Sequence, residues 1–287
     1  MHDSIMNRRK RTSDVFVSGL INLSAAFSVI LLAGIIAYVF VKGIRSVNLQ
    51  FLTTVTSTLN KTVGIAGNIV NTLYIIVITL LIATPVGIGS AIYLNEYAKP
   101  GKLVRAIEFT TETLSGIPSI IFGMFGMMFF GTGLGLGYSI LTGSLTLTLM
   151  VLPLITRNTQ EALKTVPDSY RSGALGMGAT KWYMIRTILL PSAAPGILTG
   201  VILSIGRIVG ESAALLFTAG SGFQLPKNLF GKLFESSGTL TIQLYLSMQK
   251  AKYDQAFGIA VVLLIIVLGI NLLTRFLTNR FDVTKLK

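Results

Sequence analysis

Charged side chains inside an apolar stretch are the residues of this sequence best placed to do chemistry. Arg207 and Glu211 occur in the apolar run ILSIGRIVGESAALLF. An ionised Arg or Asp costs about 2.5 to 3.5 kcal/mol to insert at the centre of a membrane helix, so such residues need a reason. Residues four apart share a helix face, where the two charges would partly neutralise each other. The alternative is that Arg207 faces a water-filled path, where its guanidinium meets an oxyanion that Glu211 holds or gates.

Arg157 is the second candidate, and it ends the apolar run VLPLITRN. At a membrane boundary, an Arg side chain can keep its stem in apolar surroundings while its charged head reaches water. The functional alternative is a second basic residue along an anion path. Arginine suits phosphate because its planar guanidinium donates paired, charge-assisted hydrogen bonds.

The composition argues against catalysis by this chain. There are no cysteines, and the single histidine, His2, lies near the amino terminus. Thiol catalysis, zinc-thiolate sites, disulfides and a Ser/His/Asp arrangement are therefore excluded, and we expect no metal site. No G-x-x-x-x-G-K-[ST] phosphate loop occurs, so ATP hydrolysis by that route is not expected. We predict a chain that is not an enzyme and binds no cofactor.

The elements that must position these residues are membrane helices. Of the 287 residues, 52% are hydrophobic and 12% charged, against about 25% charged in soluble domains. A membrane-spanning helix needs about 20 apolar residues. Six segments qualify, at residues 15–41, 65–94, 113–130, 138–156, 195–219 and 256–277. The sequence therefore predicts an all-α polytopic membrane protein with six transmembrane helices, in contact with lipid.

The distribution of Lys and Arg predicts the orientation. With the amino terminus inside, the inner segments hold 16 of the 24 Lys and Arg residues, the outer segments hold seven, and Arg207 lies in a span. Because Lys and Arg accumulate on the cytoplasmic side, both termini are expected there. The net charge of +13 then needs no nucleic-acid partner. The predicted parts are cytoplasmic tails at 1–14 and 278–287, a membrane domain at 15–277, a cytoplasmic loop at 158–191 and an external loop at 220–255.

Weaker patterns concern helix packing and the external loop. Two pairs of glycines four apart, Gly196 with Gly200 and Gly206 with Gly210, are typical of close helix contacts in lipid. In the external loop, Leu240, Leu244, Tyr245 and Met248 recur at helical spacing within residues 239–253. This pattern predicts an amphipathic helix on the outer face, either a cap on the bundle or a docking surface for an external partner.

The 158–191 loop carries a motif. Counting back from Ile188-Leu189-Leu190-Pro191, ten residues reach Gly178 and six more reach Ser172. This spacing resembles the EAA loop, E-A-A-x-x-x-G followed by nine residues and I-x-L-P, of ATP-binding-cassette (ABC) importer permeases. Gly178 fits the motif, as do Ala174, Ile188, Leu190 and Pro191, whereas Ser172 replaces the Glu and Gly173 the first Ala.

The sequence around this motif narrows the resemblance to one type of permease. The runs VPDS, LGMGATKW, LPSAAPGI and GRIVGES, together with TPVGIGSAIYL near residue 84, are similar to phosphate permeases of the PstA type. The similarity extends over essentially the whole chain. The GRIVGE element is the most substrate-specific of these runs.

The resemblance implies a type I ABC importer in a bacterial or archaeal inner membrane. The expected partners are a second, PstC-type permease, a PstB-type ATPase dimer that carries ATP and Mg, and an external PstS-type phosphate-binding protein. It also implies a cytoplasmic coupling helix from about Asp168 to Gly178 that docks on the ATPase. Its contact residues would be Tyr170, Ser172, Gly173, Ala174, Leu175, Met177 and Gly178. The family's pathway residues map onto Arg157, Arg207 and Glu211.

Other functions stay open on sequence alone. The same fold could carry another oxyanion, such as molybdate, sulfate or a phosphonate. A secondary transporter or channel would act without ATPase partners, but it would leave the long basic loop unused. A membrane scaffold or phosphate sensor would still signal when transport is lost.

Overall fold

The computed structural model describes residues 12–57, 62–226 and 228–281. Residues 1–11 and 282–287 of the two predicted tails lie outside the described residues. Five helices in the described part are long and apolar enough to cross a membrane, and the number is six when one bent helix pair is counted as a span. The prediction of an all-α polytopic protein with six spans is confirmed.

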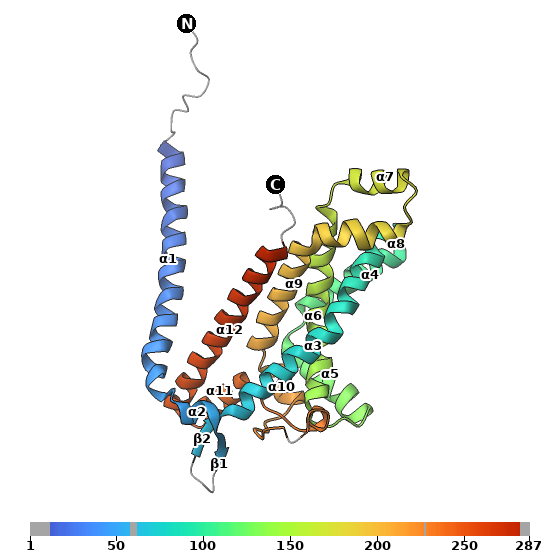
Figure 1. Ribbon diagram of the computed structural model, residues 1–287. Coiled ribbons are helices and arrows are strands. Elements are labelled where there is room, and N and C mark those ends of the chain that lie inside the picture. The colour runs from blue at the N-terminus through green and yellow to red at the C-terminus, as the bar shows by residue number, and fades with distance from the viewer. Residues whose placement is uncertain (1–11, 58–61, 227, 282–287) are drawn as a thin grey trace.

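Four predicted spans fall on single long helices (Figure 1). These helices are α1 (Thr12–Gly43), α3 (Ala66–Ile92), α6 (Ile140–Lys164) and α12 (Tyr253–Phe281). A π-helical turn, η2 (Tyr93–Tyr97), continues α3. Prolines lie inside α3 and α6, at Pro85 and Pro153, which is tolerated in membrane helices because neighbouring groups satisfy the freed backbone.

The third predicted span, 113–130, is not one straight helix. Helix α4 (Lys102–Gly116) ends there, and α5 (Ser119–Gly126) continues into a π-helical segment, η3 (Met127–Gly133), after a bend of 104°. The break falls at Ile117 and Pro118, which are both extended. A proline disfavours helical backbone in the residue before it, so Ile117 leaves the helix.

The fifth predicted span, 195–219, is displaced in the structure. A continuous helical run from Lys181 to Gly210 comprises α8 (Lys181–Met184), the π-helical turn η4 (Ile185–Leu189) and α9 (Leu190–Gly210). The π turn lies just before Pro191, which lacks an N–H, and irregular turns of this kind accommodate prolines in membrane helices. The helix then ends at Glu211, which is extended, and α10 (Ala213–Thr218) is separate.

The predicted loop 158–191 is consequently shorter. Helix α6 continues through Lys164, and the next span begins at Lys181. The part between them contains one helix, α7 (Asp168–Gly176). The difference arises because polar residues that favour helices extend a span beyond its apolar stretch. In Figure 1, α7 lies at the same end of the bundle as the start of α1 and the end of α12.

Helices α3, α6 and α9 form the centre of the bundle. Their buried residues include Ile75, Leu147 and Ile208, which belong to one core cluster. A Cβ on Gly196 or Gly200 would lie 2.6 Å from the Cβ of Ala162 or Asn158, respectively, on α6. The first glycine pair therefore marks a close helix contact. The prediction is wrong for Gly206 and Gly210 within this chain, because a Cβ on either meets nothing within 4 Å.

The opposite end of the bundle carries short elements. They are η1 (Ile44–Ser46), α2 (Leu49–Thr53), the antiparallel strands β1 (Val55–Ser57) and β2 (Thr62–Ile65), η5 (Gly231–Phe234) and α11 (Leu240–Gln249). Helix α11 is the predicted outer helix, but Leu240 and Ile242 are buried. It packs into the bundle as a cap, with Tyr245 and Met248 left partly exposed.

Candidate functional site

Arg157 and Arg207 line the same cavity, although they come from different helices. The cavity has a volume of about 170 Å³ and lies between α4, α6 and α9. Its other lining residues are Thr111, Glu112, Ser115, Met150, Pro153 and Leu154. Arg207 is exposed, so its charged group is accessible from the cavity. The structure thus brings together two of the three residues that the sequence assigned to an anion path.

Glu112, on α4, completes the charged set of this cavity. Arg157 Nη1 donates a hydrogen bond to Glu112 Oε1 at 3.2 Å. Both side chains are more than 60% exposed, so the pair contributes little stability, in the range of about 0 to 1 kcal/mol. Two arginines and one carboxylate leave a net positive charge. A charged cleft of this kind raises the local concentration of anions.

Glu211 does not share a helix face with Arg207, and that prediction is wrong. Glu211 is the extended residue that ends α9. Its Oε1 accepts a hydrogen bond from the backbone N–H of Ala214 at 3.0 Å, at the start of α10. Its backbone carbonyl accepts from Thr241 Oγ1 at 2.7 Å. Within the described residues no ion pair joins Arg207 to Glu211, so the compensated-pair interpretation has no support.

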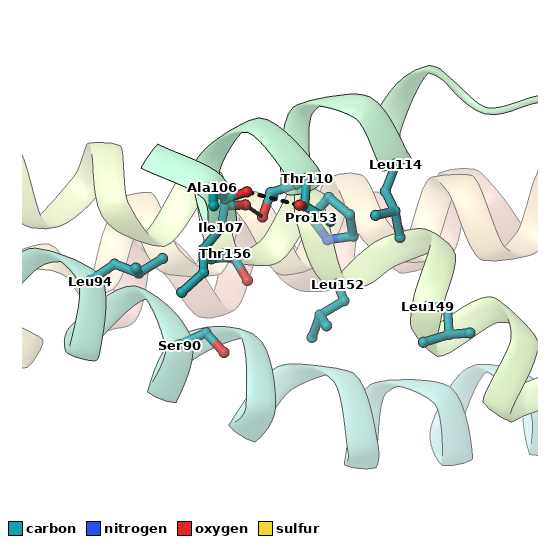
Figure 2. A pocket seen from close by; sticks show the side chains of 11 residues that line it. Ser90, Leu94, Ala106, Ile107, Thr110, Leu114, Leu149, Leu152, Pro153 and Thr156 are labelled. Atoms are coloured by element: carbon teal, nitrogen blue, oxygen red, sulfur yellow. Dashed lines mark hydrogen bonds between the residues drawn. The ribbon is translucent and has the colours of Figure 1, made fainter. Parts of the chain in front are cut away.

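Two further cavities share lining residues with the arginine cavity. The first, of about 240 Å³, shares Thr111, Glu112 and Arg157 with the arginine cavity and extends along α6 to Lys164. The second, of about 350 Å³, is mostly apolar and lies between α3, α4 and α6. In Figure 2, Ser90 from α3 and Leu149 and Leu152 from α6 line it beneath α4. No residue of α4 is buried, so this helix is only loosely packed beside the charged site.

Helix α7 occupies the predicted coupling segment and presents apolar side chains. Tyr170 and Leu175 are about half exposed and Met177 is 91% exposed, whereas Ala174 is buried. Ser172 and Gly173 are also exposed. An exposed apolar set on a short polar helix is typical of a surface that another protein covers.

Gly178 ends α7 for a backbone reason. Its φ is +83°, a left-handed conformation that glycine adopts without steric cost. Its N–H donates to the Leu175 carbonyl, and the Ala179 N–H donates to the Ala174 carbonyl, both at 3.0 Å. This pair of bonds is the Schellman motif. The motif glycine therefore fixes where the helix stops and the chain returns to the next span.

Arg171 ties α7 to the bundle. Its Nη2 and Nε donate at 2.9 and 3.2 Å to Oε1 of Glu96, which lies on η2, the continuation of α3. The guanidinium also donates to the carbonyls of Leu163 and Val166 and to Asp168 Oδ1. The Arg171 and Glu96 side chains are 18% and 5% exposed. These contacts join α7 to η2, at the end of α3, and to the end of α6.

Comparison with known proteins identifies the family. Residues 83–284 match the family described as "Binding-protein-dependent transport system inner membrane component". The chain belongs to this family. The match includes the arginine cavity and α7, whereas α1 precedes it. The chain is thus a permease component of an ABC importer and a multi-pass membrane protein.

Named relatives and a solved structure agree with this assignment. The permease is 36% identical to "Probable ABC transporter permease protein YqgI" of Bacillus subtilis, over 95% of this chain and 96% of that protein. It is 36% identical to "Phosphate transport system permease protein PstA" of Mycobacterium leprae, over 71% of this chain and 68% of that protein. A bacterial alginate ABC transporter in complex with an alginate pentasaccharide-bound periplasmic protein has the same fold, with a TM-score of 0.67, 19% identity, and coverage of 93% and 96%.

Sequence reasoning missed two residues of the permease, Glu112 and Arg171. Glu112 lies one residue before the predicted third span, so it was assigned to the loop. The bend at Pro118 instead places α4 beside the cavity. Arg171 was counted as one of several loop charges, and no local pattern links it to Glu96, 75 residues earlier. For each contact, the only available signal in the sequence was an acidic residue next to an apolar span. These residues are Glu112 at the cavity and Glu96 beside Arg171.

Proposed function

We propose that this chain is the permease subunit of an ATP-driven phosphate importer and forms half of its translocation path. The observation that carries the proposal is the shared cavity of Arg157 and Arg207. Guanidinium groups from two spans can bind one tetrahedral oxyanion from two sides, each through paired N–H donors. Neither arginine is needed for the core, since both lie outside the buried cluster.

The choice of phosphate is supported by the relatives rather than by the fold. A PstA permease is 33% identical to this chain over 83% of its length, in Xylella fastidiosa. The fold also occurs in transporters of alginate and of methionine, so fold alone does not select the cargo. Two arginines in one small cavity suit a compact anion better than a neutral or zwitterionic solute.

Helix α7 is the proposed contact with the ATPase. Its exposed apolar residues would enter a groove on a partner chain, and the Arg171 contacts would pass the displacement to α3 and α6. ATP hydrolysis would then occur on two PstB-type subunits, with ATP and Mg bound there. This division agrees with the absence of a phosphate loop from the sequence.

The open face of α9 is the proposed surface of the path. Leu203, Gly206, Arg207 and Gly210 are exposed and recur at helical spacing. A second, PstC-type permease across this face would close the path. A PstS-type binding protein would deliver phosphate at the end of the bundle opposite α7. The role of Glu211 would be to hold α10 and α11 at that end rather than to bind the anion.

The test is phosphate uptake by the complete complex in liposomes. We expect Arg207→Gln to lower uptake at least about 100-fold, because the loss of a charge-assisted contact to the anion costs about 3 kcal/mol. The complex should still assemble, since Arg207 has no structural partner among the described residues. Size-exclusion chromatography verifies assembly before uptake is measured.

Arg105→Gln provides the matched control. Arg105 is an exposed arginine on α4 that lines none of the three cavities described above, and its loss should leave uptake within about twofold of wild type. Normal uptake in an assembled Arg207→Gln complex would reject the proposed path. Equal loss in both variants would indicate a general charge effect instead.

A further inference from the structure

In the arginine cavity, some hydrogen-bonding groups have a protein partner and others have none among the described residues. Arg157 donates through Nη1 to Glu112 Oε1. Over the residues that the structure describes, the other N–H groups of Arg157, all those of Arg207 and the second carboxylate oxygen of Glu112 have no protein partner. The cavity therefore offers several charged donors and one charged acceptor. A ligand that uses all of them needs acceptor oxygens and at least one O–H.

This pattern separates two classes of tetrahedral anion. Inorganic phosphate retains at least one proton at neutral pH, so it can donate a hydrogen bond to a carboxylate. Sulfate and molybdate carry no proton and could only place an oxygen against Glu112. Two negative charges in contact repel each other, and a carboxylate cannot donate to relieve that contact. Size and shape differ little between phosphate and sulfate, so the proton is the main distinguishing feature.

We propose that Glu112 makes this cavity selective for protonated oxyanions and rejects fully ionised ones. The inference rests on the proposed function, because it assumes that the anion binds between Arg157 and Arg207. Glu112 lies within reach of the same guanidinium that would hold the anion, as its 3.2 Å bond to Arg157 demonstrates. The carboxylate would then accept the O–H of phosphate while Arg157 and Arg207 bind the other oxygens.

Hydroxyl groups beside Glu112 allow Glu112→Gln to test selectivity without removing every acceptor for the phosphate O–H. Thr111 Oγ1 donates to the Ile107 carbonyl at 2.8 Å, and Ser115 Oγ donates to the Glu112 carbonyl at 2.7 Å. Both residues line the cavity, and because their protons are engaged, their oxygens can act there only as neutral acceptors. In Glu112→Gln the phosphate O–H keeps these acceptors, and the new amide N–H can donate to sulfate. The pair with Arg157 is exposed, so the variant should fold normally.

The experiment is equilibrium binding of labelled phosphate and labelled sulfate to the purified permease-ATPase complex in detergent. The external binding protein is left out because its own selectivity would mask that of the permease. A site that hydrogen-bonds a substrate hydroxyl discriminates strongly against analogues without it, and for this partly exposed site we expect about 100-fold preference for phosphate in wild type. Glu112→Gln should keep phosphate binding within about fivefold and reduce the preference to less than about tenfold.

Glu108→Gln is the matched control, because Glu108 precedes Glu112 by one helical turn and lines the neighbouring cavity only. Its preference should equal that of wild type. An unchanged preference in Glu112→Gln, or equal binding of both anions by wild type, would overturn the inference. Arg207→Gln separates the two proposals, since it should abolish phosphate binding whatever the role of Glu112. Phosphate binding that survives Arg207→Gln, or no binding by wild type at millimolar phosphate, would reject the shared site itself.

Discussion

At the scale of single residues, Arg171 uses all five of its N–H donors in contacts within the protein. Its guanidinium donates to Glu96, Asp168 and two backbone carbonyls. Arginine has five N–H donors in a fixed planar arrangement, which lysine cannot reproduce. The residue therefore joins α7 to the nearby end of α6 and to Glu96, which lies 75 residues earlier. In contrast, the exposed pair of Arg157 with Glu112 leaves its groups free for a ligand.

We expect Arg171→Met to destabilise the protein by about 3 kcal/mol, because it leaves the buried Glu96 carboxylate without its partner. Thermal unfolding of the purified chain in detergent measures the effect. The double variant with Glu96→Gln should recover most of the loss, since no unpaired buried charge remains.

Arg186→Met is the control for this prediction. Arg186 is exposed and lies on η4, so its loss should change stability by no more than about 0.5 kcal/mol. If Arg171→Met unfolds at the same temperature as Arg186→Met, the ion pair between Arg171 and Glu96 does not contribute to the stability of the protein.

At the scale of elements, α7 combines a rigid attachment with an exposed apolar surface. Arg171 and buried Ala174 hold one side of it, and the Gly178 turn fixes its end. Tyr170, Leu175 and Met177 remain exposed. A helix that docks and transmits force requires both properties. Helix α4 has the opposite character, because it has no buried residue and lies over an apolar cavity.

We expect Leu175→Glu to weaken association with the ATPase at least about tenfold, because an exposed apolar residue that the proposed interface would bury becomes a charge. Co-purification of the ATPase with the tagged chain measures the association, and phosphate uptake should fall in parallel.

Ser172→Glu is the matched control on the same helix. It adds the same charge at an exposed position where the EAA motif itself carries Glu, so association should be retained. Equal loss in both variants would mean that α7 tolerates no added charge. Undiminished association in Leu175→Glu would argue against docking through this surface.

At the scale of the whole molecule, the segments predicted to be cytoplasmic gather at one end. The start of α1, the helix α7 and the end of α12 lie together in Figure 1, whereas the β1–β2 hairpin and α11 lie at the opposite end. The charge count and the arrangement of the helices are independent observations. The arrangement places these segments at one end, and the charge count predicts that this end is the cytoplasmic one.

Single cysteines test this orientation directly, because the chain has none of its own. We expect Phe230→Cys to react with a membrane-impermeant maleimide in intact spheroplasts. Lys102→Cys should react only after permeabilisation. Both positions are exposed, so access to the thiol depends on the side of the membrane alone. The reverse labelling pattern would invert the proposed topology.

The sequence by itself determined the class of fold, the number of spans and the position of α7. Long apolar runs permit only a helical membrane structure, since every backbone group must be paired within the bilayer. The glycine of the EAA spacing likewise fixed the end of α7, because its backbone conformation is a local property. Arg157 and Arg207 were identified for the same reason, as charges in apolar surroundings.

Only the tertiary structure decided which charges meet. Glu211 was assigned to Arg207 because they are four residues apart, but a helix end between them sends Glu211 to α10. Glu112 joined the cavity because a 104° bend after α4 carries it there. The partner of Arg171 lies 75 residues away. Helix breaks and contacts between distant segments depend on the packing of several spans at once, and periodicity along one span carries no information about them.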